Sequence, residues 1–186
     1  MYDVLKIKKD LRNLVKEKRY EHSILVAEEA IQLAKYYNYD EEKAYVAGLV
    51  HDIAKEFSEE ENKKWIEKYN LSKKFLLPKY EKLVHAEVGS VVVKEWYKLD
   101  DEISNAVKYH TIGNPNMTLL EKIVFISDKI GRKEKTEKIE EIKKLAYEDL
   151  DKALLRYLQY QKEKLESKDK EFHPLTKELY NKLEKK

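Results

Sequence analysis

Residues 47–55 read AGLVHDIAK, an apolar segment that places a histidine and an aspartate, His51 and Asp52, side by side. Ala44, Ala47 and His51 recur at steps of three and four residues, which is the spacing of one buried helix face. A carboxylate buried without a partner costs several kcal/mol, so such groups are normally paired or bound to a metal ion. The segment therefore predicts a helix that carries ionisable side chains into the protein interior.

Four other ionisable side chains follow the same rule, each on the apolar face of its own predicted helix. His85, for example, lies in line with Gly89, Val92 and Trp96. Imidazole nitrogen and carboxylate oxygen hold Fe, Mn or Zn at hydrolytic centres. The alternative is that each histidine is a hydrogen-bonded core residue and each aspartate a helix cap. This alternative is less convincing for the whole set, because it requires four of the five histidines to lie on apolar helix faces by accident. The candidate metal ligands are His22, His51, Asp52, His85, His110 and Asp128.

Composition narrows the class of protein. A chain of 186 residues is long enough for one well-buried core, so we expect a single domain over 1–186. Lys and Arg number 38 against 36 Asp and Glu, and the charges are interspersed, which disfavours binding of long nucleic acid. No cysteine is present, so metal ligands must be nitrogen and oxygen. Without an apolar run that suggests a signal peptide or a membrane span, we expect a cytoplasmic protein that does not bind membranes.

The low content of helix breakers, four Gly and three Pro, predicts an almost wholly helical chain. We expect capping boxes at Ser58 with Glu61 and at Thr118 with Glu121, and Asp100 as a further cap. Leu5 falls within the helical repeat of the first helix. The expected helices cover 4–16, 19–37, 42–55, a helix opening at Ser58, 83–97, a helix from Asp100 to His110, a helix from Thr118 that carries Asp128, 139–165 with a possible break, and 174–183.

The ordered motifs resemble the HD-domain superfamily of metal-dependent phosphohydrolases, and more closely its YqeK group. The segments that carry the resemblance are 19–22, 47–55, 83–85, 109–113, 125–130, 149–151 and 173–176. The resemblance implies an all-α HD-domain helical bundle with a buried metal centre, a core over about 19–130 and C-terminal helices over about 139–183. It also implies symmetrical hydrolysis of diadenosine tetraphosphate, or of a related dinucleoside polyphosphate, to two ADP.

Within this scheme His22, His51, Asp52 and Asp128 make a first metal position. His85 and His110 supply a second, with Asp52 bridging as a catalytic residue. We expect one or two ions, divalent or mixed-valence; iron is the first expectation, and manganese and zinc are the alternatives. Such a pair of ions generates hydroxide near neutral pH for attack on phosphorus.

Several residues are candidates for contact with the nucleotide substrate. Lys55 lies one helical turn beyond His51, where it could contact a phosphate or protonate the leaving group, although most lysines in so charged a chain are merely solvated. Arg19 could bind phosphate or pair with a surface glutamate. Thr111 and Gly113 could hold substrate or only shape a turn. The full set is Arg19, Lys55, Thr111, Gly113, Arg132 and His173, of which His173 could instead cap the last helix.

One segment departs from the family pattern. After the distal aspartate the family usually has Glu-Pro and then an Arg, whereas residues 130–134 read IGRKE. Arg132 or Lys133 could replace the missing Arg, but Gly131 cannot replace a carboxylate. The alternatives for function are therefore a nucleotidase or cyclic-nucleotide phosphodiesterase of the same superfamily and, ranked lower, a non-catalytic nucleotide-binding HD module. A homodimer is possible in each case.

Overall fold

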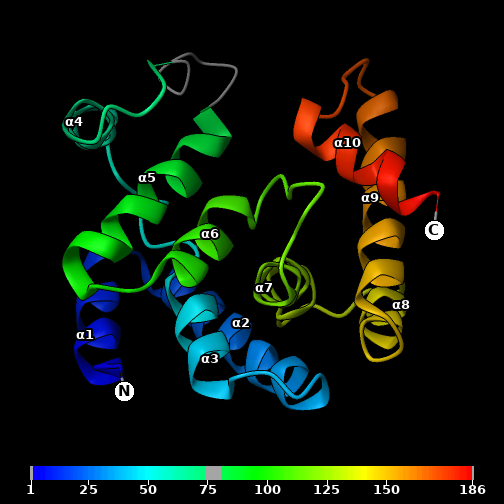
Figure 1. Cartoon of the computed structure of the whole chain (residues 1–186), viewed down its shortest axis with the longest axis horizontal. Helices are drawn as coiled ribbons and strands as arrows, with labels where there is room; N and C mark the ends of the chain where they lie inside the picture. The colour runs from blue at the N-terminus through cyan, green and yellow to red at the C-terminus, as the bar shows by residue number, and fades with distance from the viewer. Residues whose placement is uncertain (1, 74–80, 186) are drawn as a thin grey trace.

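A computed structural model describes residues 2–73 and 81–185, and within these ranges the chain is helical without strands (Figure 1). This confirms the predicted all-α class. The helices are α1 (Val4–Leu14), α2 (Glu17–Tyr36), α3 (Glu41–Val50), α4 (Glu59–Lys68), α5 (Glu81–Tyr97), α6 (Asp101–Tyr109), α7 (Leu119–Ile130), α8 (Glu137–Ala146), α9 (Leu150–Glu166) and α10 (Pro174–Leu183).

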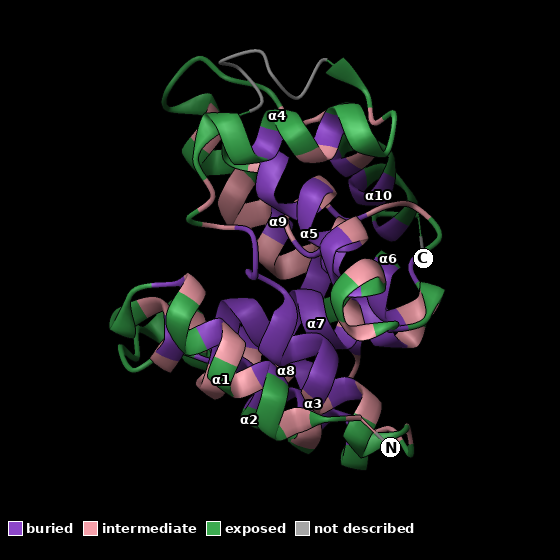
Figure 2. Ribbon diagram, turned by 90° about the vertical axis from the view of Figure 1, so that its left-hand side faces the viewer, coloured by how far each residue is buried: buried purple, intermediate pink, exposed green. Residues whose placement is uncertain are grey.

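Helix α7 lies at the centre of the molecule. It packs against α2, α3 and α6 on one side and against α8 and α9 on the other. In Figure 2 the buried residues gather around α7 and the neighbouring turns of α2 and α3, whereas α4 is mostly exposed. Ile123, Val124 and Ile126 are fully buried, which matches the apolar periodicity of this segment. Ionisable side chains on the buried face of α7, such as Asp128, are therefore held in the interior.

Helices α2 and α3 approach each other closely at Gly48. A Cβ atom placed there would lie 2.9 Å from Cα of Ala27 on α2, closer than side-chain carbons come to backbone atoms. Glycine therefore lets the two backbones meet, and this contact places the end of α3 against the middle of α2.

Local capping explains where most helices begin. Ser58 and Glu61 form the predicted capping box at α4, and Asp100 accepts a hydrogen bond from the Ile103 amide at the start of α6. The second predicted capping box is only half present. Thr118 accepts from the backbone amide of Glu121, but the Glu121 side chain accepts instead from the side-chain nitrogen Nδ2 of Asn114.

Four predictions about the helices need correction. α3 ends at Val50, and residues 51–56 form turns rather than the last turn of a helix. α6 likewise ends at Tyr109, so His110 follows it. Leu5 is 82 % exposed, since α1 packs through Ile7 and Leu11. Trp96 is also exposed rather than part of the inward stripe. The possible break within 139–165 is confirmed, because α8 and α9 are separate helices.

Among the described residues, none of the helices is both long enough and apolar enough to cross a lipid bilayer.

Candidate metal centre

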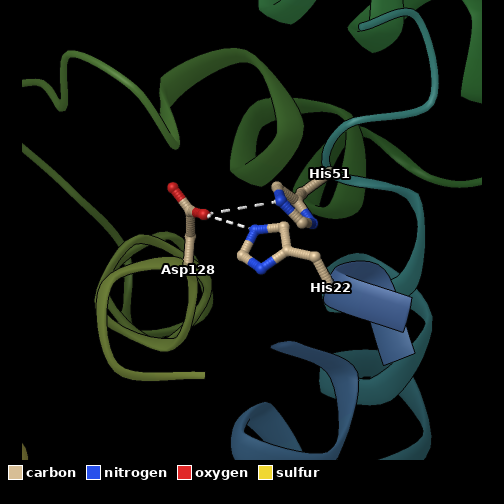
Figure 3. Close-up of side chains that lie close together, drawn as sticks. All are labelled: His22, His51 and Asp128. Carbon is tan, nitrogen blue, oxygen red and sulfur yellow. Dashed lines mark hydrogen bonds and ion pairs between the residues drawn. The ribbon is translucent and has the colours of Figure 1, made fainter. Parts of the chain in front are cut away.

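The six predicted ligands converge from five parts of the fold. His22 comes from α2, His51 and Asp52 from the turn after α3, His85 from α5, His110 from the end of α6 and Asp128 from α7. Ligand atoms of His22, His51 and Asp128 all lie within 4.8 Å of one another, and so do those of His51, Asp52 and His110. Figure 3 shows the first of these groups, with both imidazoles directed at one oxygen of Asp128.

The two histidines that end helices are oriented in the same way. Nδ1 of His51 lies 2.6 Å from the carbonyl oxygen of Gly48, and Nδ1 of His110 lies 2.6 Å from that of Val107, three residues back in each case. Because a carbonyl only accepts, each Nδ1 donates, and Nε2 of the neutral ring keeps its lone pair. A backbone hydrogen bond of this kind commonly orients histidine ligands of metals.

Asp52 lies between the two groups of imidazoles. Its Oδ1 is 3.1 Å from Nε2 of His85 and 3.4 Å from Nε2 of His110. Its Oδ2 is 3.6 Å from Nε2 of His51 and 2.7 Å from Nη1 of Arg19. A carboxylate that faces histidines with both oxygens has the geometry of a bridging ligand.

The unpartnered atoms support a metal in this place. Among the described residues, Nε2 of His51 and Oδ1 of Asp52 are buried without a hydrogen-bond partner. Buried polar atoms normally have partners, so such orphans require an explanation. A cation explains both, because each atom carries a free lone pair. The residues present therefore fit a metal ion bound by nitrogen and oxygen.

The electrostatics of the cluster suit metal ligation. Burial by itself would raise the pKa of Asp52, but the neighbouring imidazoles of His51, His110 and His85 outweigh it and hold that pKa well below its ordinary value. Burial lowers the pKa of His85 to about 4, and burial also lowers the pKa of His110. Both rings are therefore neutral at physiological pH, the form in which imidazole binds metals.

Two predicted substrate residues lie directly on the cluster. Arg19 pairs with the buried carboxylate of Asp52, not with a surface glutamate. Nζ of Lys55 lies 3.0 Å from Nε2 of His85 and 3.8 Å from Oδ1 of Asp52, with about a third of its side chain exposed. Lys55 is therefore not merely solvated, and it reaches both the cluster and the solvent.

A cleft of about 660 Å³ opens over the cluster. Its lining includes the predicted substrate residues Arg19, Lys55, Thr111 and Arg132. Within the part of the chain that the structure describes, Oγ1 of Thr111 is buried without a hydrogen-bond partner. The remaining lining residues are Lys16, Lys18, Glu21, His22, Leu25, Asp52, Glu56, His110, Asp128, Lys129, Lys133 and Glu134.

The structure does not bring Gly113 and His173 into the lining of this cleft. Gly113 has φ +65°, and a Cβ there would lie 2.6 Å from a methyl carbon of Leu179 on α10, so this glycine shapes a turn packed against α10. His173 is the N-cap of α10 and accepts a hydrogen bond from the Leu175 amide.

Sequence reasoning missed Lys129. This lysine is 9 % exposed, and its Nζ lies 2.6 Å from Oδ2 of Asp128. Burial by itself would lower the pKa of Lys129, but the Asp128 charge outweighs burial and raises it. The signal that could have found it is its place as the one cation within the mostly apolar run of residues 123–130, next to a predicted ligand.

The helical fold and its buried histidine–aspartate cluster define an HD-type hydrolase. The chain belongs to the HD domain family, whose model matches residues 19–133, and this confirms the resemblance seen in the motif order. It is 36 % identical to a protein of Halalkalibacterium halodurans over 90 % of this chain and 89 % of the relative. It is also 36 % identical to a protein of Bacillus subtilis, over 89 % of each chain. Both relatives are named bis(5'-nucleosyl)-tetraphosphatase, symmetrical.

A solved structure is also similar to this chain. It is a crystal structure from Clostridium acetobutylicum, described as a predicted HD superfamily hydrolase involved in NAD metabolism. The TM-score is 0.90 at 37 % identity, over 100 % of this chain and 98 % of that one.

Proposed function

We propose that this chain is a metal-dependent phosphohydrolase that cleaves diadenosine tetraphosphate symmetrically into two ADP. The observation that carries the proposal is the convergence of four histidines and two aspartates at the base of a cleft rich in lysine and arginine. The proposed substrate comes from the names of the two relatives, both of which match this chain over most of their length. The cleft volume of about 660 Å³ lies within the range of small-molecule sites, roughly 300–1,000 Å³.

In this proposal His22, His51 and Asp128 hold one ion, His85 and His110 hold a second, and Asp52 lies between them. Iron is the proposed metal, with manganese and zinc as alternatives that the same nitrogen and oxygen ligands accept. When bound, such ions supply Lewis acidity that polarises the phosphoryl oxygens and makes a water molecule nucleophilic near neutral pH.

The side chains around the centre would neutralise the charge of a polyphosphate. Arg19, Lys55 and Arg132 line one cleft with the cluster, so they would bind phosphate oxygens and orient the chain for attack. Symmetrical cleavage adds water to one of the two middle phosphorus atoms and breaks its bond to the central bridging oxygen, which leaves with the other ADP. In the proposal Lys55, whose Nζ lies 3.0 Å from Nε2 of His85, donates the proton that this leaving oxygen requires.

One observation favours a second candidate, a nucleotidase or phosphodiesterase that uses the same centre. A Cβ at position 131 would lie 2.7 Å from the Ser127 carbonyl oxygen and 3.0 Å from that of Leu25. The backbone here therefore excludes any side chain at a position next to the cleft-lining Arg132, where the family pattern has a Glu-Pro pair. A pocket so altered could accept a different phosphate ester.

A substrate panel tests the proposal. Purified chain loaded with Fe²⁺ or Mn²⁺ is incubated with diadenosine tetraphosphate, nucleoside monophosphates and cyclic nucleotides, and the products are separated by ion-exchange chromatography. We expect ADP as the only product from diadenosine tetraphosphate. ATP with AMP, or turnover of monophosphates or cyclic nucleotides alone, would contradict it. Full nucleotide affinity without turnover in both wild type and Asp52→Ala would indicate a non-catalytic module.

A homodimer and a cytoplasmic location stay predictions from the sequence.

A further inference from the structure

Lys129 is a buried residue in the lining of the cleft, directly beside a candidate metal ligand. Its Nζ donates to Oδ2 of Asp128 at 2.6 Å and to the carbonyl oxygen of His110 at 3.3 Å. Its other neighbours include the ring faces of Phe125 and Tyr157, whose centroids lie 4.8 and 5.4 Å from Nζ. A lysine this deep is rare unless it is paired, so the contact with Asp128 is its main polar anchor.

The two oxygens of Asp128 have different partners. Oδ1 lies 3.0 Å from Nε2 of His22 and 3.6 Å from Nε2 of His51. Oδ2 is engaged by Lys129. Figure 3 shows the first oxygen directed at both imidazoles and the second directed away from them. Asp128 therefore presents one oxygen to the histidines.

We propose that Lys129 is a positioning residue that makes Asp128 a one-oxygen ligand and weakens the hold of the centre on its cation. The inference rests on the proposed function, because it requires a metal ion at His22, His51 and Asp128. Lys129 does so in two ways: its hydrogen bond occupies Oδ2, and its fixed positive charge repels a cation bound nearby.

Removing the ammonium of Lys129 has two effects, and both increase the affinity of the centre for a metal ion. A divalent cation no longer meets a neighbouring positive charge, and in the metal-free chain the buried Asp128 loses its nearest lysine partner. Both favour the metal-bound form. The opposing effect is the rotational freedom that Asp128 gains, which is small for a short side chain. A merely structural lysine would give the opposite result, because damage to the site weakens ligand binding.

The test is calorimetric titration of Mn²⁺ into the full-length chain after removal of metals with a chelator. We expect Lys129→Met to bind Mn²⁺ at least about tenfold more tightly than wild type. We also expect its metal-free form to melt at a lower temperature and to gain more in Tm when Mn²⁺ is added. Lys129→Gln retains a hydrogen-bond donor without the charge, so it should also bind more tightly, and it serves if Lys129→Met does not fold.

Lys122→Met is the matched control. Lys122 is on the same helix and pairs with Asp151 at 2.6 Å, but it does not line the cleft. Its loss should leave the Mn²⁺ affinity unchanged. If wild type binds Mn²⁺ and the folded Lys129 variants bind it equally or more weakly, the inference is overturned while the metal centre stands. If wild type and all variants bind no Mn²⁺, the metal centre fails, and the inference fails with it.

Discussion

Nε2 of His22 lies 3.0 Å from Oδ1 of Asp128, although 106 positions separate the two residues in the chain. The contact exists because α2 and α7 pack together along their apolar faces. A histidine from one helix and an aspartate from another thus complete a cluster whose remaining members come from the ends of α3 and α6 and from α5.

Loss of Asp52 should abolish hydrolysis. Its carboxylate lies between His51 on one side and His85 and His110 on the other, so no neighbouring group can replace it. Asp52→Asn should lower kcat/KM for diadenosine tetraphosphate by more than about 100-fold, the upper loss for residues that only support metal ligands. Asp101→Asn, at an exposed position, is the control. Equal activity of both variants would remove Asp52 from the mechanism.

Lys55→Met should lower kcat more than it raises KM. The lysine reaches the cluster at His85, where it would protonate the leaving oxygen, and general acid catalysis contributes about 10²–10⁴-fold. Steady-state kinetics on metal-loaded protein measure this. Lys64→Met is a suitable control because Lys64 is exposed and pairs with the exposed Glu60. A rise in KM with normal kcat would indicate that Lys55 only binds substrate.

Glu121 should make the chain less stable as pH rises. Burial raises the pKa of this carboxyl group above its ordinary value. The folded state therefore binds its proton more tightly than the unfolded state, so the favourable contribution is present at low pH and is lost as pH rises through the folded pKa. Glu121→Gln should raise Tm at pH 8 and have less effect at pH 5, because Gln can still accept from Asn114.

Glu29→Gln provides the contrast for this pH dependence. Glu29 is also buried, but it accepts from Lys143 at 2.6 Å and from Tyr147 at 3.0 Å. Removing its charge breaks an ion pair, so Tm should fall at pH 8. Thermal melts of both variants at pH 5 and pH 8 test these expectations. A fall in Tm for Glu121→Gln at pH 8 would refute the claim that burial raises the pKa of Glu121.

Gly48→Ala should destabilise the fold by about 1–3 kcal/mol, the usual cost of overpacking. The added carbon would meet the backbone of Ala27, which cannot move aside without shifting α2. Ala is the better helix former by about 1 kcal/mol, so the clash must exceed that gain. Gly89→Ala is the milder comparison, because its contacts are side-chain carbons of Val107, Ile53 and Ala54. Urea denaturation should show a larger loss in the free energy of unfolding for Gly48→Ala than for Gly89→Ala.

Periodicity predicted that the ligands are buried, which is confirmed for all of them except the partly exposed His22, but it did not predict where the helices end. His85 and Asp128 follow apolar repeats along α5 and α7, and both are buried as expected. No Gly or Pro directly follows His51, so the sequence carries no local stop signal there. α3 ends where Nδ1 of His51 donates a hydrogen bond to the carbonyl oxygen of Gly48, three residues back, and the ring turns into the interior.

Lys129 shows a different limit of sequence reasoning. In a chain with 40 % charged residues a single lysine resembles many solvated ones, and only the fold places its Nζ beside Asp128. The HD-type architecture could be predicted from motif order. The single-domain organisation and the roles of the site residues stay predictions until they are measured.

The most direct test of the metal centre is anomalous diffraction from crystals of the chain grown with Mn²⁺. The account predicts a manganese peak within bonding distance of His22 Nε2, His51 Nε2 and one oxygen of Asp128, with a second peak at full loading near His85 and His110. Crystals that bind manganese elsewhere while these six side chains contact only water and one another would contradict it.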